Sequence, residues 1–200
     1  MKIRTIAVIY ILTVLLTLSL SACGNESLDR KTIPYGKDGA YAGFSDIPSD
    51  YTAEEAALDG CLVIDTTREP NVHRVLVASQ QSTAGYEHWE RFTEQAEAGE
   101  DAFLRVAHFI DGTGYYHDLY YVDGWYVLFT WNEYGITKEG SFQYLRCFAE
   151  TSGAKSHRLY VLTDSMELTY HDVTWTFLSS SLSTVTDIPF IWLGFMTYFE

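Results

Sequence analysis

Hydrophobic residues concentrate in three consecutive runs in the middle of the chain, at residues 103–110, 115–122 and 125–133. The first two runs flank Asp111-Gly112-Thr113-Gly114, and Asp123-Gly124 separates the second run from the third. Asp-Gly between runs rich in β-branched and aromatic residues is typical of a type I′ hairpin turn, in which both central residues have positive φ. The pattern therefore predicts three antiparallel strands joined by two tight turns.

The register of these strands follows from counting outward from each turn, if both turns contain two residues. One face then carries Leu104, Val106, His108, Ile110, Tyr115, His117, Leu119, Tyr121, Tyr126, Leu128 and Thr130. The opposite face carries Phe103, Arg105, Ala107, Phe109, Tyr116, Asp118, Tyr120, Val122, Trp125, Val127, Phe129 and Trp131. Neither face is consistently polar, so we expect other parts of the chain to cover much of both.

Two helices are expected before these strands. Thr52-Ala-Glu-Glu55 has the pattern of a capping box and predicts a short helix over residues 53–58. In residues 86–98, a turn of about 100° per residue places Trp89, Phe92 and Ala96 in one stripe, which we expect to pack on the sheet. Glutamates occupy the other side of this helix; they could form a cation site or paired catalytic acids, but a solvated helix face is the simpler interpretation.

Further short apolar or alternating segments predict strands at residues 61–64, 72–78, 141–150, 157–163 and 167–178. The fold class expected is α+β, a mostly antiparallel meander sheet with one main helix packed on one face. We expect this domain to span residues 51–180. Residues 181–200 form an apolar C-terminal tail, too short to span a membrane as a helix, which either packs as a strand or stands apart.

The first 22 residues have the layout of a secretory signal peptide, with Lys2 and Arg4 before an apolar run. Leu20-Ser21-Ala22-Cys23 resembles the lipobox of bacterial lipoproteins, in which the cysteine is lipidated and becomes the new N-terminus. An uncleaved signal anchor is the alternative. The lipobox predicts a protein held by its acyl chains on the outer face of the bacterial cytoplasmic membrane, with residues 23–50 as a flexible spacer.

The net charge limits the class of binding partner, and the cysteines raise the question of a disulfide. The formal charge of −14 would become −16 once Lys2 and Arg4 leave with the signal peptide. Such a surface argues against nucleic acid, because phosphate binding needs clustered Lys and Arg. Cys61 and Cys147 could form one disulfide outside the cytoplasm or stay as free thiols, and the sequence leaves both possibilities open.

A set of short segments carries a family resemblance. Tyr51-Thr-Ala-Glu-Glu-Ala56 leads to Asp59-Gly60 and a short strand, and a helix with Phe92 follows. Leu104-Arg-Val106, Asp118-Leu-Tyr-Tyr121 and the Asp123-Gly124 turn come next. Over residues 51–162 this order resembles the Firmicute lipoprotein domain catalogued as domain of unknown function 4362, which implies fold and location but no activity. That family carries a cysteine pair in its C-terminal hairpin; Cys147 resembles the first, whereas Thr163 and Asp164 stand near the second.

Two histidines form one candidate site. We expect His108 to lie opposite His117 across the first hairpin, close enough to share a metal ion, with Asp111 or Asp118 as a third ligand. Histidines satisfied within the fold are the simpler interpretation, because zinc sites usually need three protein ligands and Asp118 belongs to the opposite face. No cofactor is predicted.

An aromatic wall on the other face forms a second candidate site, made of Phe109, Tyr116, Tyr120, Trp125, Phe129 and Trp131. Exposed, it could bind a peptide, an envelope protein or a carbohydrate; covered by the helix or the C-terminal tail, it would be core. On this face Arg105 and Asp118 are expected to form a structural ion pair.

The chain lacks the usual nucleophile, phosphate-loop, zinc-protease and calcium-loop motifs. The leading interpretation is therefore a monomeric, non-catalytic binding lipoprotein. The alternatives are a metal-binding lipoprotein that uses the histidine pair and a cell-wall hydrolase.

Overall fold

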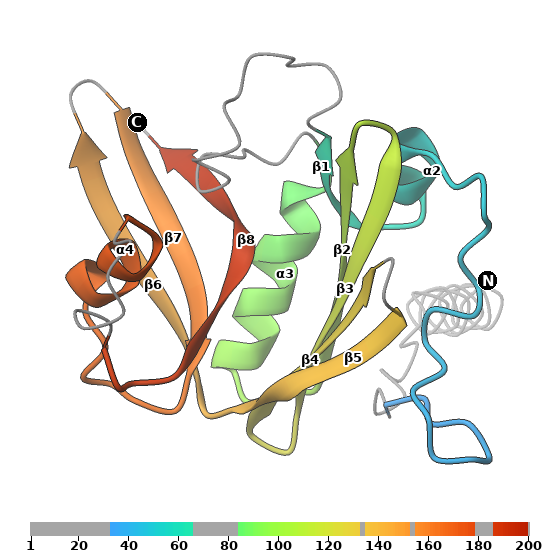
Figure 1. Ribbon diagram of the computed structural model, residues 1–200, viewed down its shortest axis with the longest axis horizontal. Helices are drawn as coiled ribbons and strands as arrows, with labels where there is room; N and C mark the ends of the chain where they lie inside the picture. The colour runs from blue at the N-terminus through green and yellow to red at the C-terminus, as the bar shows by residue number, and fades with distance from the viewer. Residues whose placement is uncertain (1–32, 66–83, 133–134, 153–154, 179–185, 200) are drawn as a thin grey trace, which may run out of the picture. The chain divides into compact units, whose positions relative to one another are not determined.

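A computed structural model describes residues 33–65, 84–132, 135–152, 155–178 and 186–199 (Figure 1). Residues from Thr32 onward belong to one compact unit. Its elements are α2 (Ala53–Leu58), β1 (Leu62–Asp65), α3 (Tyr86–Glu97), β2 (Ala102–Ile110), β3 (Thr113–Val122), β4 (Trp125–Asn132), β5 (Gly135–Phe142), β6 (Tyr144–Ser152), β7 (Lys155–Thr163), α4 (Tyr170–Leu178) and β8 (Phe190–Phe199). The predicted signal peptide, Cys23 and the predicted strand at residues 72–78 lie outside the described residues.

Strands dominate the fold and form two sheets. The larger sheet has the order β1-β2-β3-β4-β5, with β1 parallel to β2 and every other pair antiparallel. The smaller sheet has the order β6-β7-β8 and is antiparallel throughout. The predicted α+β class with a mostly antiparallel sheet is therefore confirmed.

Both Asp-Gly turns have the predicted conformation. Asp111 and Gly112 have φ of 50° and 79°, and Asp123 and Gly124 have φ of 52° and 83°. Each turn contains two residues, because Ile110 pairs with Thr113 and Val122 pairs with Trp125. Since side chains alternate along a strand, these turns fix which residues share a face of the sheet.

One face of the larger sheet packs against α3, and we call it the helix face. Leu104, Val106, Leu119 and Leu128 of the sheet share a buried cluster with Trp89, Phe92 and Ala96 of α3. Tyr160, Leu162 and Leu193 of the smaller sheet belong to the same cluster. The Trp89 and Tyr160 rings meet edge to face with centroids 4.7 Å apart. The apolar stripe of α3 therefore contacts both sheets.

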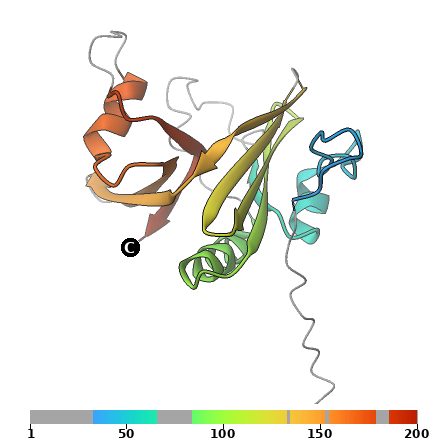
Figure 2. The same cartoon turned by 90° about the horizontal axis from the view of Figure 1, so that it is seen from below.

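The opposite face is covered by residues 33–50, which we call the N-terminal strap, and by α2; this is the strap face. Figure 2 shows both segments on the side of the sheet away from α3. Tyr41 and Phe44 of the strap are buried, and the Tyr41 ring stacks on Phe129 at 3.8 Å between centroids. The part of the predicted spacer that the structure describes, residues 33–50, therefore carries aromatic side chains that pack on the sheet.

The C-terminal part of the chain departs from prediction at one element. Residues 170–178, expected to be a strand, form α4. The Thr169 hydroxyl accepts a hydrogen bond from the Asp172 amide, and the Asp172 carboxylate accepts one from the Thr169 amide, which fixes the helix start. Val173 of α4 packs with Leu159 and Val161 of β7. Half of the predicted tail over residues 181–200 is β8, which belongs to the smaller sheet.

Two smaller points complete the fold. Cys61 is buried and Cys147 is exposed, and both are free thiols. Across the described parts of the chain, every helix is too short or too polar to cross a lipid bilayer.

Candidate functional site

A buried polar network joins the strap to the sheet. Arg105 and Asp118 lie directly opposite each other on β2 and β3. The Arg105 guanidinium donates two hydrogen bonds to the Asp118 carboxylate, from Nε at 2.7 Å and from Nη2 at 2.8 Å. Nη2 also donates to the Gly43 carbonyl, and Nη1 reaches Asp46 Oδ1 at 3.3 Å. The predicted ion pair is therefore present, and it also holds the strap.

Two tyrosines complete this network. The Tyr41 hydroxyl donates to Asp118 Oδ2 at 2.5 Å and lies 2.9 Å from the Tyr120 hydroxyl. Burial raises the pKa of Tyr120 to about 12 and raises that of Tyr41 further, so both stay neutral. Burial also raises the pKa of Asp118, and the hydrogen bonds from Arg105 and Tyr41 oppose that effect. Asp118 has 0% exposure. No substrate can reach this carboxylate, so the group has a structural role. We call Arg105, Asp118, Tyr41 and Tyr120 the latch.

The aromatic wall is mostly core. Phe109, Tyr116, Tyr120 and Phe129 are buried beneath the strap and α2. The cover is thus the N-terminal part of the chain, and neither the long helix nor the tail provides it. Trp125 is 41% exposed, at the Asp123-Gly124 end of the sheet. The structure therefore does not bring Trp125 together with the other predicted ligand-binding residues.

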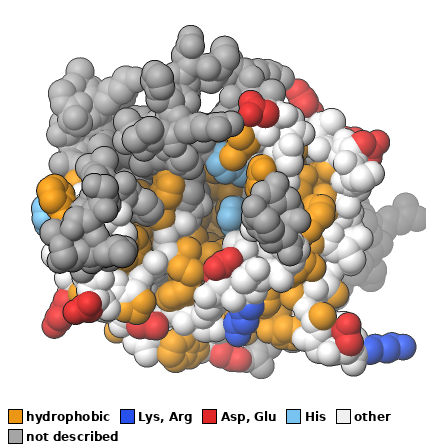
Figure 3. Space-filling view, in the orientation of Figure 1, with side chains coloured by type: hydrophobic (Ala, Val, Ile, Leu, Met, Phe, Trp, Pro, Cys, Tyr) orange, Lys and Arg blue, Asp and Glu red, His pale blue; other side chains and the backbone are white. Residues whose placement is uncertain are grey.

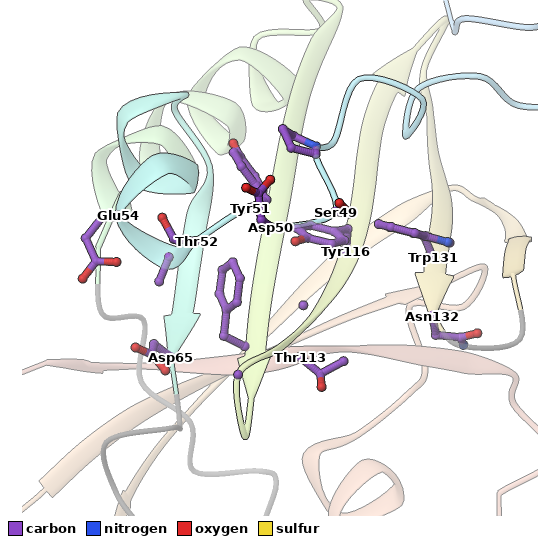
Figure 4. A pocket seen from close by; sticks show the side chains of 15 residues that line it. Ser49, Asp50, Tyr51, Thr52, Glu54, Asp65, Thr113, Tyr116, Trp131 and Asn132 are labelled. Carbon is purple, nitrogen blue, oxygen red and sulfur yellow. The ribbon is translucent and has the colours of Figure 1, made fainter.

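A pocket opens where the strap cover ends, beside the Asp111-Gly112 turn (Figure 4). Its volume is about 680 Å³. Its lining consists of residues 48–54, Asp65, Phe109, residues 112–114, Tyr116 and residues 131–132. Three of the six aromatic residues of the predicted wall, Phe109, Tyr116 and Trp131, therefore line a cavity together. Of the other three, Tyr120 belongs to the latch, Phe129 is buried against Tyr41 and Trp125 is remote.

Tyr116 lies at the centre of this pocket. Its ring stacks on Trp131 at 5.3 Å between centroids and meets the Phe109 ring edge to face at 6.1 Å. The ring lies over Gly114, where an added Cβ would collide with the Tyr116 hydroxyl, so only glycine permits this rotamer. The hydroxyl has no hydrogen-bond partner among the described residues, and burial raises its pKa. In Figure 4 it points into the space between the labelled pocket residues.

The acidic residues of the pocket were not singled out by the sequence interpretation. Asp50 precedes the capping box, Glu54 lies within it, and Asp65 ends β1. The Thr52 hydroxyl accepts from the Glu55 amide at 3.2 Å, and the Glu55 carboxylate accepts from the Thr52 amide at 2.9 Å. This predicted capping box holds the wall that carries Asp50 and Glu54. The helix start was therefore a local signal for this part of the lining, but only the tertiary structure brings Asp65 to it.

The histidine pair needs a correction. His117 is opposite Val106 and His108 is opposite Tyr115, so the two histidines are diagonal neighbours on the helix face. The earlier pairing was wrong because a two-residue turn after Ile110 shifts each partner by two positions. Burial lowers the pKa of both to about 4, and for His108 the neighbouring His117 adds to the effect. Figure 3 shows histidine side chains in a hollow bordered by hydrophobic ones.

Neither of the two aspartates expected as a third metal ligand lies beside the histidines. Asp118 is on the strap face and bound to Arg105, and Asp111 occupies the turn. His108 Nε2 is buried without a hydrogen-bond partner among the described residues. Within the ranges that the structure describes, no three His, Cys, Asp or Glu side chains are grouped as a metal site requires.

Comparisons of the chain with protein-family models, with curated proteins and with solved structures give no match. The resemblance to domain of unknown function 4362 therefore stays a prediction, and the function has to be argued from the pocket itself.

Proposed function

We propose that this protein is a lipid-anchored, non-catalytic binding module on the outer face of a bacterial cytoplasmic membrane, with the pocket beside the Asp111-Gly112 turn as its ligand site. The lipobox sequence supports the anchor, and the pocket supports the binding role. The finer arrangement that we propose for the domain is a meander sheet with one main helix packed on one face.

The pocket is the single observation that carries the binding role. A cavity of about 680 Å³ that combines aromatic side chains with a few polar groups has the size and lining of a small-molecule or side-chain site. Tyr116 contributes a hydroxyl that has no hydrogen-bond partner among the described residues. A hydroxyl that lines a cavity in this way is available to a ligand.

The anchor is tested by replacing the acylated thiol. Cys23→Ser removes the sulfur to which the lipid would be attached, so we expect the protein to leave the membrane fraction and to lose incorporation of labelled palmitate. Cys61→Ser is the matched control and should stay in the membrane fraction. Equal membrane association and labelling of both variants would contradict the anchor.

Binding is tested with the full chain in detergent micelles and three defined probes: soluble peptidoglycan fragments, an N-acetylglucosamine trimer and a lysine-rich peptide. We expect calorimetric binding of at least one probe, and its loss in Ser49→Trp, which fills the pocket. Ile136→Trp, on exposed β5, is the control. Heat from no probe, or equal binding by both variants, would overturn the pocket as the site. New reducing ends from peptidoglycan would instead favour the hydrolase, and binding lost on chelation would favour the metal-binding alternative.

A further inference from the structure

We infer that the strap face is the side of the domain that rests on the membrane, and that Tyr35 and Trp125 contact the lipid head groups there. The inference rests on the proposed lipid anchor at Cys23 and adds which surface that anchor brings to the bilayer. Three observations carry it: the short chain between Cys23 and the strap, the face on which the strap starts, and the exposed aromatic rings of that face.

The chain between the proposed anchor and the folded domain is short. The structure describes the strap from Ile33 onward, and Ile33 packs on the buried cluster of the strap face. Cys23 and Ile33 are ten residues apart. A fully extended chain spans about 3.5 Å per residue, so this tether reaches at most about 35 Å. The point where the strap meets the sheet therefore stays within that distance of the acylated end.

The domain is thicker than this tether is long. A compact unit that runs from residue 32 to residue 200 is expected to have a radius of gyration of about 15 Å, and hence a diameter of about 40 Å. The two sheets share one buried cluster with α3, and α4 packs on the other side of the smaller sheet. A tether that leaves from the strap face is too short to pass around these layers. It therefore keeps α4 away from the bilayer.

The strap face carries two exposed rings of the kinds that gather at membrane surfaces. Tyr35 is 51% exposed and Trp125 is 41% exposed. The Tyr35 ring lies 6.2 Å from the Phe129 ring, and Phe129 and Trp125 are four residues apart on the same face of β4. Four residues of strand span about 13 Å, so one bilayer surface can meet both rings. Tyr and Trp are enriched at the head-group level because each combines an apolar ring with a polar group.

The charge of the protein makes this contact depend on the anchor. The formal charge of the whole chain is −14, so an anionic bilayer repels the domain when no acyl chain holds it. The contact also leaves the pocket open. Trp131 of the pocket lining is six residues farther along β4 than Trp125, which is about 20 Å of strand.

Quenchers carried by lipids test which face meets the bilayer. The acylated full chain is reconstituted into phosphatidylcholine vesicles with and without a lipid that bears a doxyl group near its head group, and tryptophan fluorescence is compared. Trp125→Phe removes the ring proposed to contact lipid. Trp175→Phe is the matched control, because Trp175 is 43% exposed on α4. We expect the lipid-dependent quenching to fall at least twofold in Trp125→Phe and to stay unchanged in Trp175→Phe.

The variants and the anchor have separate controls. Both substitutions keep an aromatic ring at an exposed position, so the fold is retained, which the melting temperature verifies. Cys23→Ser, mixed with the same vesicles, should show no quenching. Equal quenching of Cys23→Ser and the parent would overturn the role of the tether in the inference.

The outcomes separate the two proposals. Quenching that falls in Trp175→Phe as much as in Trp125→Phe, or more, overturns the assignment of the membrane-facing side and leaves the anchor in place. The absence of quenching in an acylated, vesicle-bound parent has the same meaning. A parent that carries no lipid and stays out of the vesicles overturns the anchor and the inference together.

Discussion

The two faces of the larger sheet are covered by different means. On the helix face, α3 places aliphatic and aromatic side chains against Leu104, Leu119 and Leu128 along the sheet. On the strap face, irregular backbone crosses the sheet and is held by a buried Arg105–Asp118 pair and by Tyr41. A regular helix fills its face by repetition of one stripe, whereas a loop held at one point covers only part of its face. The pocket lies where that cover ends.

The largest expected loss of stability comes from a substitution in the latch on the strap face. Asp118→Ala leaves the Arg105 guanidinium buried without its partner, which should cost about 3–5 kcal/mol of unfolding free energy. Asp46→Ala removes the exposed partner of the same guanidinium and should cost less than about 1 kcal/mol. Urea unfolding followed by tryptophan fluorescence measures both. Equal costs would mean that the latch does not hold the strap by the buried pair.

The second prediction concerns the helix face, which carries the buried His108 and the half-buried His117. Their pKa values of about 4 lie below the ordinary 6.5, so the unfolded chain takes up protons first as the pH falls. Their contribution to stability is complete above pH 6.5 and is lost as the pH falls toward 4, by at most about 3 kcal/mol for each histidine. Urea midpoints between pH 7 and 4 should show this fall. The double variant His108→Gln/His117→Gln should have a flatter profile, and an unchanged slope would contradict the assignment.

The features of the two sheet faces that the sequence predicted are those that depend on residues close together in the chain. Asp111-Gly112 and Asp123-Gly124 set their own turn conformation, so the strands and the residues that share a face followed from the sequence. The predicted pairing of His108 with His117 was nevertheless wrong by two positions. The latch followed in part, because the sequence placed Arg105 and Asp118 on one face as diagonal neighbours, and the structure has them directly opposite. The strap did not: Tyr41 bonds to Asp118 across 77 residues, and no local pattern reports such a contact.

The α4 segment and the pocket were also predicted only in part, because long-range or competing signals decide their structure. Residues 167–178 alternate enough to resemble a strand, but Thr169 and Asp172 supply a helix start that outweighs the alternation. The pocket combines residues from the strap, α2, β1 and two strand ends. The sequence predicted that the aromatic residues of the pocket share one face of the sheet. It did not show which of them the strap would bury.

A smaller change sharpens the account of the latch. Tyr41→Phe keeps the ring stacked on Phe129 and removes only the hydroxyl bonded to Asp118, so we expect a loss of about 1–3 kcal/mol. Tyr35→Phe, on the exposed part of the strap, is the matched control and should be nearly neutral. Comparable losses in chemical unfolding would show that the ring, and not the hydrogen bond, secures the strap.

The smallest expected effect concerns the pocket wall. Thr52→Ala removes the cap of α2 and should lower the unfolding free energy by about 1 kcal/mol. It should also raise amide hydrogen exchange in residues 53–58 while exchange in α3 stays the same. Faster exchange in both helices would indicate a global loss of stability and no specific link between the cap and this wall.

The long sequence separation of the latch also bears on the order of folding. The hairpins of β2, β3 and β4 need only two-residue turns, so their ends meet quickly. The Tyr41–Asp118 bond closes a loop of 77 residues and carries a larger entropic cost before it forms. We therefore expect the sheet to assemble first and the strap to close last. The pocket wall over residues 48–54 arrives with that closing step, so an occupied pocket would report that the whole domain has finished folding.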